Sequence, residues 1–278
     1  MTTVQDALRQ ANLVLAEVGI AGAPHDARRL MAATLDVGPD RVTLHSQDAL
    51  DDIQEAAFFA SVYARAEGTP VSHLVGGREF FGRWFVVTED VLDPRPETEI
   101  LVQEALSETF LDVLDLGTGS GAILASLLAE RPVAIGVGSD ISEPALCVAI
   151  RNATAHEVDT RVHFEVSDWY GSIGGQYDLI VSNPPYIAAD EMEDLQPEVR
   201  LYEPRIALTD EADGLTAYRK ITAGAPDHLN PGGRLIVEIG PTQAIAVSNM
   251  MQAAGLTGIE VRQDLDGRDR VVLGRKPL

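Results

Sequence analysis

The sequence predicts an α/β fold in which a small helical bundle precedes a mostly parallel sheet. Two observations support this prediction. From residue 96 onward, short β-branched runs alternate with helical patterns, which is typical of parallel strands joined by helices. Before residue 74, apolar residues recur at helical spacing, and glycine or proline separates the segments. With 278 residues, the chain is long enough for both parts to have a core.

The first part is expected to contain three short amphipathic helices. They cover about residues 3–19, 24–38 and 52–68, with Thr2 or Thr3 as the first cap. Nothing in this stretch resembles catalytic chemistry. We therefore expect residues 1–74 to form a lid or a substrate-docking domain.

Residues 75–95 have a different composition. Within them, residues 80–87 are rich in aromatic and β-branched side chains, which predicts a β-hairpin. The hairpin is expected to link the two parts of the chain. A role facing the substrate remains equally open.

Residues 96–278 carry the alternating pattern of the second domain. We expect seven strands, at about 111–116, 133–137, 162–166, 177–181, 233–239, 259–262 and 270–273. The intervening helices are predicted at about 97–110, 121–131, 144–153, 215–228 and 243–254. The stretch between the fourth strand and the next helix is expected to be a long loop.

Charge and composition narrow the classes of function. The formal net charge is −22, and only two of the 21 basic residues are lysine, with no basic cluster. Because nucleic-acid binding relies on clustered Lys and Arg, the charge favours a protein or small-molecule substrate over direct nucleic-acid binding. No apolar run of 18 residues and no charged-then-apolar leader occurs, so we expect neither a membrane span nor a signal peptide.

Cysteine and histidine usage also limits the possibilities. The single cysteine, Cys147, excludes an internal disulfide framework and is consistent with a reducing, cytoplasmic location. The six histidines are scattered along the chain, and no two have the spacing of metal ligands. The sequence therefore predicts no metal site.

The segment Ser182-Asn183-Pro184-Pro185-Tyr186 follows a buried strand that must end there, because neither proline can donate an N–H. The turn holds the Asn183 side chain and nearby carbonyls at the carboxyl edge of the sheet, where open α/β sheets bind ligands. An amide oxygen beside a backbone carbonyl can accept both hydrogens of a planar NH₂ group. The motif therefore indicates a substrate with an amide or an exocyclic amine.

A second motif, Asp115-Leu116-Gly117-Thr118-Gly119-Ser120-Gly121, lies where a strand opens into a helix. Glycines at alternate positions permit positive φ angles and let a ligand lie against the backbone. The third glycine comes one residue too early for a dinucleotide fingerprint, and no phosphate-loop lysine follows. Asp115 would place a carboxylate beside the pocket, which suits a cationic sulfonium or ammonium group better than a phosphate.

Two further strand ends carry candidate ligands. Asp140 follows the second strand, where an acidic side chain can accept hydrogen bonds from ribose hydroxyls. Asp168 and Trp169 follow the third strand and could bind the amino group and the face of an adenine. Helix initiation at Asp140 and simple packing of Trp169 are the structural alternatives.

These motifs resemble the HemK/PrmC family, whose members methylate the glutamine of the Gly-Gly-Gln motif in peptide chain release factors. Further segments extend the resemblance over nearly the whole chain: Pro94-Arg95-Pro96-Glu97-Thr98-Glu99, Pro197 to Pro204, Asp213-Gly214-Leu215, Pro231-Gly232-Gly233, Glu238-Ile239-Gly240 and Asp264 to Arg270. Two departures are Asp93, where an apolar residue is common, and Gly138-Ser139, which lengthens the turn before Asp140.

The resemblance implies a Rossmann-like class I S-adenosylmethionine-dependent methyltransferase fold. It implies a cofactor site, with S-adenosyl-L-homocysteine as product, formed by Asp115, Gly117, Thr118, Gly119, Ser120, Gly121, Asp140, Asp168, Trp169 and Asn183. Catalysis is expected from Asn183, Pro184 and Tyr186, and substrate binding from these together with Pro185, Arg95 and Glu97. Class I release factors are the implied partners of a monomeric enzyme.

Two other substrates remain open. An adenine-amino DNA methyltransferase shares Asn-Pro-Pro-Tyr because its exocyclic amine has the same geometry, but it must hold and flip a base. Ribosomal protein or RNA is another possible acceptor. A catalytically silent scaffold of the same fold is disfavoured by the intact glycine motif, Asp140 and Asn183.

Overall fold

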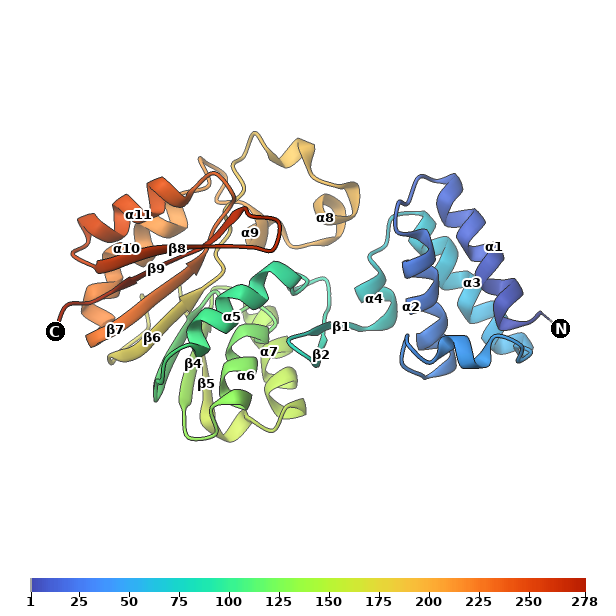
Figure 1. Ribbon diagram of the computed structural model, residues 1–278, viewed down its shortest axis with the longest axis horizontal. Helices are drawn as coiled ribbons and strands as arrows, with labels where there is room; N and C mark the ends of the chain where they lie inside the picture. Colours follow the sequence, from blue (N-terminus) through green and yellow to red (C-terminus); the bar gives the residue numbers. More distant parts are fainter. Residues whose placement is uncertain (1) are drawn as a thin grey trace. The chain divides into compact units, whose positions relative to one another are not determined.

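The computed structural model describes residues 2–278, and the chain forms two compact units (Figure 1). The first unit comprises the chain up to Gly77 together with Gln196–Tyr202. The second comprises Arg78–Leu195 and Glu203–Leu278. The chain therefore leaves the second unit after Leu195 and re-enters it at Glu203.

The first unit is a helical bundle. It contains the α-helices α1 (Val4–Glu17), α2 (Ala23–Leu35), α3 (Asp52–Ala66) and α4 (Val71–Val75), and the 3₁₀ helix η1 (Val42–His45). Its helix starts follow from capping residues: the Thr3 side chain accepts from the Asp6 N–H, and Asp51 forms a capping box with Gln54. Apolar residues at helical spacing, among them Leu15, form its buried core.

Helix α8 (Pro197–Tyr202) joins this unit through an ion-pair network. The side chain of Arg65 in α3 is only 8% exposed, and its Nε binds Oδ2 of Asp26 in α2 at 2.7 Å. The same guanidinium also pairs with Glu198 of α8. Burial alone would lower the pKa of Arg65, but its bonds to the two carboxylates outweigh this effect and raise it.

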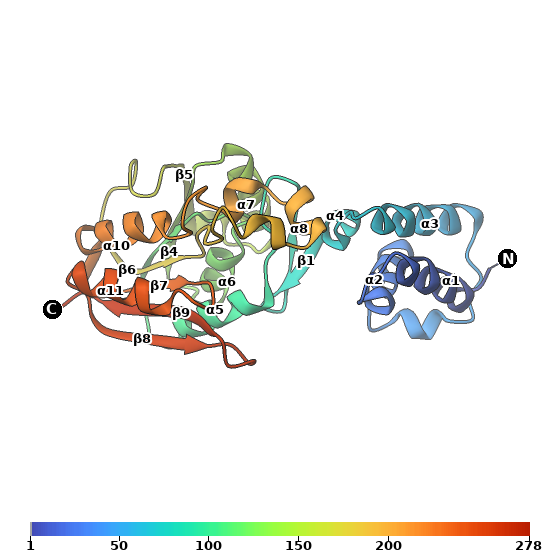
Figure 2. The ribbon, with the colours of Figure 1, turned by 90° about the horizontal axis from the view of Figure 1, so that it is seen from above.

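The second unit is built around a seven-stranded sheet with the order β5-β4-β3-β6-β7-β9-β8. Its strands are β3 (Asp112–Leu116), β4 (Ile135–Asp140), β5 (Val162–Val166), β6 (Tyr177–Ser182), β7 (Leu229–Glu238), β8 (Thr257–Gln263) and β9 (Asp269–Arg275). All pairings are parallel except those of β9 with β7 and β8. The edges are β5 and β8 (Figure 2). The strand order reverses at β3, the point where α/β sheets form their ligand crevice.

Helices cover both faces of this sheet (Figure 1). One face carries α5 (Glu99–Leu106), α6 (Ala122–Glu130) and α7 (Glu143–Ala155) over one buried apolar cluster. The other face carries α10 (Thr216–His228) and α11 (Ala244–Ala253) over a second cluster. The remaining short helices are η2 (Pro96–Thr98), η3 (Asp159–Arg161), η4 (Met192–Asp194) and α9 (Arg205–Leu208).

The aromatic hairpin is β1 (Gly77–Phe80) and β2 (Arg83–Val86), and it packs on the α5–α7 face. Phe80 and Phe85 are fully buried there and meet edge to face, with ring centroids 6.0 Å apart. Asn152 of α7 holds the backbone of Val86 through both its amide oxygen and its amide nitrogen. From Arg78 onward, the hairpin therefore belongs to the second unit.

The predicted α/β class and its seven mostly parallel strands are confirmed. The predicted helix at 97–110 is shorter, since α5 begins at Glu99 after a 3₁₀ turn and ends at Leu106. The long loop contains three short helices that local patterning did not predict, η4, α8 and α9. Asp93 is buried and pairs with Arg78 at 2.8 Å, which explains how a carboxylate is accommodated before Pro94.

Two kinds of feature are absent from the described residues. No helix within residues 2–278 is long and apolar enough to cross a membrane. Across the same residues, no group of three or more His, Cys, Asp or Glu side chains could hold a metal ion.

Candidate active site

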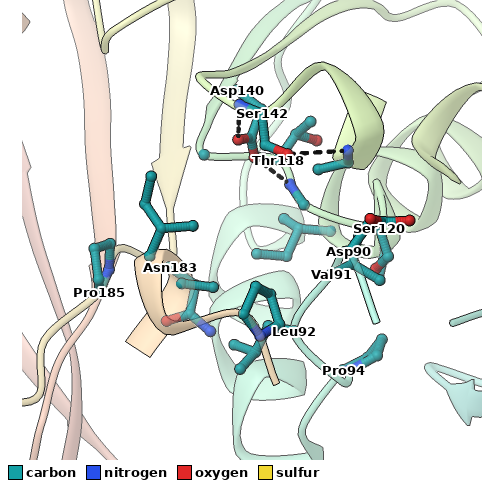
Figure 3. Close-up of a pocket in the computed structure, with 18 of the residues that line it drawn as sticks. Asp90, Val91, Leu92, Pro94, Thr118, Ser120, Asp140, Ser142, Asn183 and Pro185 are labelled. Atoms are coloured by element: carbon teal, nitrogen blue, oxygen red, sulfur yellow. Dashed lines mark hydrogen bonds between the residues drawn. The ribbon is translucent and has the colours of Figure 1, made fainter. Parts of the chain in front are cut away.

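A cavity lies at the carboxyl edge of the sheet, and its lining residues all belong to the second unit (Figure 3). Asp140 and Ser142 lie at one end of it, and Asn183 lies near Leu92 and Pro94 at the other. The lining also includes Phe80, Asp90, Val91, Asp93, Arg95, Thr98, Gly117, Thr118, Gly119, Ser120, Ala122, Ile123, Ile141, Ala145, Ser167, Asp168, Trp169, Pro185, Pro204, Ile206 and Ala207.

The glycine motif forms the loop from β3 into α6. Gly117, Gly119 and Gly121 have φ angles of +68°, +53° and +75°, a region that side chains of L-residues rarely adopt. A Cβ on Gly121 would lie 3.1 Å from the Cβ of Ala149 in α7, so this glycine permits close helix packing. A Cβ on Gly119 would meet nothing within 4 Å. The two positions therefore serve different purposes, one packing and one exposing the backbone.

Asp140 closes this loop from the end of β4. Its Oδ2 accepts the Gly119 N–H at 2.9 Å and its Oδ1 accepts the Ser142 N–H at 2.9 Å. Burial raises the pKa of Asp140, although these backbone donors oppose the shift. A carboxylate oxygen has two lone pairs, so Oδ2 can still accept a ligand hydroxyl.

Asp115 lies beneath the loop, outside the cavity lining. It is fully buried, and its Oδ2 accepts the Thr118 hydroxyl at 2.7 Å. Burial, together with the nearby charge of Asp140, raises its pKa to about 7, while the Thr118 bond opposes the rise. Its Oδ1 has no hydrogen-bond partner. Asp115 therefore acts on the pocket through the loop above it rather than as a lining group.

Asp168 and Trp169 both line the cavity, as the sequence suggested. The Asp168 carboxylate is bound by Lys220 Nζ at 3.0 and 3.1 Å, and both side chains are about half exposed. Trp169 has a φ of +53° and places its ring 3.8 Å from a Cβ built on Gly117. An aromatic face thus lies beside the glycine loop.

Asn183 follows β6 directly and faces the cavity with one half of its amide unpaired. Its Nδ2 donates to the Thr98 hydroxyl at 3.2 Å. Its Oδ1 is buried and has no partner. Since buried polar atoms are nearly always paired, this oxygen is an acceptor held ready for a donor. Ser182 fixes the strand end by donating to the carbonyl of Leu116 in β3 at 2.7 Å.

The other residues of the motif have different environments. Pro185 lines the cavity, whereas the buried Pro184 and the half-buried Tyr186 lie outside the lining. The Tyr186 carbonyl accepts from Gln243 Nε2 at 2.9 Å, which anchors the turn to the start of α11. Burial raises the pKa of the Tyr186 phenol to about 12, with Glu238 adding to the shift.

Of Arg95 and Glu97, only Arg95 lines the cavity. Its Nη2 donates to Oε1 of the buried Glu203 at 2.5 Å and to Oε2 at 2.8 Å. Burial raises the pKa of Glu203, and the charge of Arg95 is the largest opposing effect. Glu97 is exposed and lies outside the lining.

Several lining residues were missed by the sequence analysis. Ile141 and Ser142 directly follow Asp140, so their positions in the sequence could have predicted that they line the cavity. Asp90 to Leu92, Ile206 and Ala207 gave no local signal, and Asp93, Pro94 and Pro204 were noted only in the family resemblance and not as lining residues. They reach the cavity only through tertiary packing.

The residues present fit an adenosyl cofactor with a cationic sulfonium. Asp140 offers a carboxylate for hydroxyls, the glycine loop leaves backbone open, and Trp169 and Ile206 provide apolar surface. The buried, unpartnered oxygen of Asn183 then marks where a donor of the substrate can bind.

Comparisons with known proteins agree with this geometry. Residues 6–76 match the family model described as the PrmC N-terminal domain, and residues 85–199 match the methyltransferase small domain. Among solved structures, a methyltransferase from Pyrococcus furiosus has a TM-score of 0.56 at 17% identity, covering 82% of this chain and 100% of its own. A T. thermophilus 16S rRNA methyltransferase in complex with AdoMet and guanosine has a TM-score of 0.50 at 17% identity, covering 72% of this chain and 49% of its own. These two likenesses concern the fold alone.

The decisive comparison is with a curated relative. The release factor glutamine methyltransferase of Cereibacter sphaeroides is 54% identical over 272 residues, which is 98% of this chain and 98% of the relative. The match therefore runs through the sequence of both units. The chain therefore belongs to the release factor glutamine methyltransferase family.

Proposed function

We propose that this protein transfers a methyl group from S-adenosyl-L-methionine to the side-chain amide nitrogen of the glutamine in the Gly-Gly-Gln motif of class I peptide chain release factors, and so acts in translation termination. One observation carries the proposal: the buried Asn183 Oδ1 has no partner in a cavity that also contains Asp140. The names of the relatives supply the substrate that fits this acceptor.

The cofactor would be held by the side of the cavity that the glycine loop forms. When bound, S-adenosyl-L-methionine supplies an electrophilic methyl group on a cationic sulfur. Asp140 is positioned to accept a ribose hydroxyl, and the open backbone at Gly117 and Gly119 allows close approach. Trp169 offers an aromatic face, and Asp168 an acceptor shared with Lys220, for the adenine.

Asn183 and Pro184 would hold the substrate amide. The lone pair of a glutamine nitrogen is delocalised, so the nitrogen attacks only when it is well aligned. Asn183 Oδ1 and the Pro184 carbonyl can accept the two N–H groups and direct the nitrogen, and such positioning provides effective molarities on the order of 10⁵ M or more. Carbonyl acceptors also stabilise the positive charge that develops on the attacking nitrogen.

The surrounding groups complete the proposal. Tyr186 and Pro185 would flank the substrate amide, and Arg95 and Glu97 would contact the substrate near the cavity entrance. The first unit, which matches the PrmC N-terminal domain, would dock the release factor. We also propose that the protein is cytoplasmic, because one cysteine in 278 residues suits a reducing compartment. We further propose that it is a monomer, which light scattering tests.

The proposal is tested by incubating the purified chain with S-adenosyl-L-methionine and a class I release factor, followed by peptide mass spectrometry. We expect a single methyl group on the glutamine of the Gly-Gly-Gln peptide, and none with Asn183→Ala. Duplex DNA and ribosomes serve as competing acceptors in parallel reactions. Transfer to either of these, with none to the release factor, would overturn the assignment.

A further inference from the structure

One side-chain amide joins three loops at the far end of the turn that begins with Asn183. Gln243, the residue before α11, donates from Nε2 to the Tyr186 carbonyl at 2.9 Å and to the Gly214 carbonyl at 3.2 Å. Its Oε1 accepts the Gly240 N–H at 3.0 Å. The three partners follow β6, precede α10 and follow β7, respectively. The amide therefore uses both its donor and its acceptor on the backbone of separate loops.

Gly214 is suited to this contact by its lack of a side chain. It has a φ of +72°, and a Cβ there would clash with the Tyr186 carbonyl oxygen and lie 3.1 Å from Gln243 Nε2. The loop that presents its carbonyl is folded around Asp210, whose Oδ1 accepts the Gly214 N–H at 2.9 Å. Glycine at this position therefore allows two backbone carbonyls to approach one amide.

Gly240 places the third partner. It comes two residues after the end of β7, and the intervening Ile239 N–H donates to the Arg270 carbonyl of β9 at 2.8 Å. A Cβ on Gly240 would lie 3.1 Å from Gln243 Oε1 and 3.4 Å from Tyr186 Cδ2. The sheet therefore supports the N–H that orients the amide, and a small residue leaves room for it.

The start of the same turn is anchored separately. Ser182 donates to a carbonyl of β3 at 2.7 Å, as described above. Between Ser182 and Tyr186, the two prolines each have a fixed φ. A short segment that is bonded at both ends and stiff in the middle leaves the Asn183 side chain little freedom to move. The bond from Gln243 is the second of the two anchors.

We propose that Gln243 is a positioning residue that holds the end of the Asn183 turn. The segments Asp213-Gly214-Leu215 and Glu238-Ile239-Gly240 place the other backbone groups that it binds. Gln243 and both segments lie outside the cavity lining, so they act through the Tyr186 carbonyl rather than on the reacting atoms. The inference rests on the proposed function, because this turn is the one that would accept the substrate amide.

Two substitutions separate this role from a role in starting α11. Gln243→Glu keeps an oxygen for Gly240 but has no donor for the two carbonyls, whereas Gln243→Lys has donors for the carbonyls but no acceptor. At the N-terminus of a helix, a negative charge is favourable and a positive charge is unfavourable. A role limited to starting α11 therefore predicts that Gln243→Glu is the more active variant. The positioning role predicts that Gln243→Lys is.

The experiment measures single-turnover methyl transfer to the release factor at saturating cofactor. In Gln243→Glu, the maximal rate should fall about 10- to 100-fold, as expected for misplaced groups. The half-saturating concentration of release factor and the dissociation constant of the cofactor should change less than about 3-fold, since neither binding surface is altered. Gln252→Glu makes the same chemical change at an exposed position of α11 and should match the wild type.

Amide hydrogen exchange tests the anchor without any substrate. Ile187 follows Tyr186, and its N–H donates to the Leu208 carbonyl at 3.0 Å. This N–H should exchange faster in Gln243→Glu than in the wild type or Gln252→Glu, while exchange in β3 stays unchanged. Unchanged exchange at Ile187, or a rate for Gln243→Glu that equals or exceeds that of Gln243→Lys, would overturn the inference. A wild-type enzyme that does not methylate the release factor would instead overturn the proposed function, and the exchange measurement would still test the anchor.

Discussion

The two ends of the cavity differ in how completely their polar groups are paired. At the Asp140 end, both carboxylate oxygens already accept backbone N–H groups from the loops they close. At the Asn183 end, one edge of the amide is bonded and the other is buried without a partner. The first end is assembled by backbone close to β3 and β4, whereas the second is supported by side chains distant in sequence.

Under the proposed function, the Asp140 end would bind the cofactor, and the Asn183 end would hold the group that reacts. A site whose polar groups are already held in place can bind a cofactor with little rearrangement. A buried acceptor without a partner costs about 1–3 kcal/mol of folding free energy, which a substrate donor offsets only when it arrives. Interactions that are completed by the reacting group favour the reaction step over simple binding.

The largest expected effect comes from removing the acceptor. In Asn183→Ala, the nitrogen of the substrate would lose one of its two proposed carbonyl acceptors, so the rate of methyl transfer should fall about 10²- to 10³-fold. Cofactor affinity should change less than about 3-fold, because the Asp140 end is intact. Single-turnover kinetics and calorimetry test the two values separately. A parallel loss of affinity would show that the two ends are not distinct.

The next effect concerns the opposite end. In Asp140→Asn, an NH₂ group faces one of the two backbone donors, and the proposed charge-assisted bond to a ribose hydroxyl would be lost. We expect the dissociation constant of S-adenosyl-L-methionine to rise about 10- to 100-fold, with a much smaller change in rate at saturating cofactor. Calorimetric titration measures the first, and Ser142→Ala, which leaves the backbone donor in place, is the control.

A matched pair of glycine variants tests packing against exposure. Gly121→Ala would place a Cβ 3.1 Å from Ala149 as well as imposing a side chain at positive φ, so it should destabilise the fold by about 2–4 kcal/mol. Gly119→Ala has only the backbone strain, about 1 kcal/mol, because its Cβ meets nothing within 4 Å. Urea unfolding measures both. Equal losses would contradict the different purposes assigned to these glycines.

Asp115 allows a test by pH. Its pKa is about 7 in the folded protein, against 3.8 as the ordinary value, so between these the folded state binds a proton that the unfolded state lacks. Stability from this group therefore falls as the pH rises through that window. Asp115→Asn should lose less stability between pH 5 and pH 7 than the wild type does. The urea midpoint measured at both pH values provides the comparison, and equal falls would contradict the burial of this carboxyl.

The smallest expected effect is at the exposed ion pair of Lys220 and Asp168. Such pairs contribute about 0–1 kcal/mol, so Lys220→Ala should leave the unfolding midpoint nearly unchanged. Cofactor affinity should shift by less than about 3-fold, since the Asp168 carboxylate stays in place. A larger loss of affinity would assign Lys220 a direct part in cofactor binding.

Much of the fold could be predicted from local patterns. The strands before Gly117, Asp140, Asp168 and Asn183 are short apolar runs with clear ends, so the sequence placed their following loops on one rim. Asn183 and Asp140 were identified because the sequence places each at the carboxyl end of a strand, and parallel strands bring their carboxyl ends to one edge.

The remaining features depend on contacts between distant segments. The burial of Asp115 beneath its own loop depends on how α6 and β4 pack above it. The hydrogen bond between Asn183 and Thr98 joins two segments that are far apart in the chain. Helix α8 looks like part of a loop in sequence, and the ion pairs of Arg65 give it a place in the first unit. No local periodicity encodes such pairings.

The most direct test of the distinction between the two ends is a double-mutant cycle with Asn183→Ala and Asp140→Asn, measured as the second-order rate constant for methyl transfer. The two side chains share no hydrogen-bond partner: Asn183 binds Thr98, and Asp140 binds Gly119 and Ser142. We predict that the free-energy effects of the two substitutions add to within about 0.5 kcal/mol. A coupling energy well above that value would contradict the account, because it would show that the two ends act as one unit.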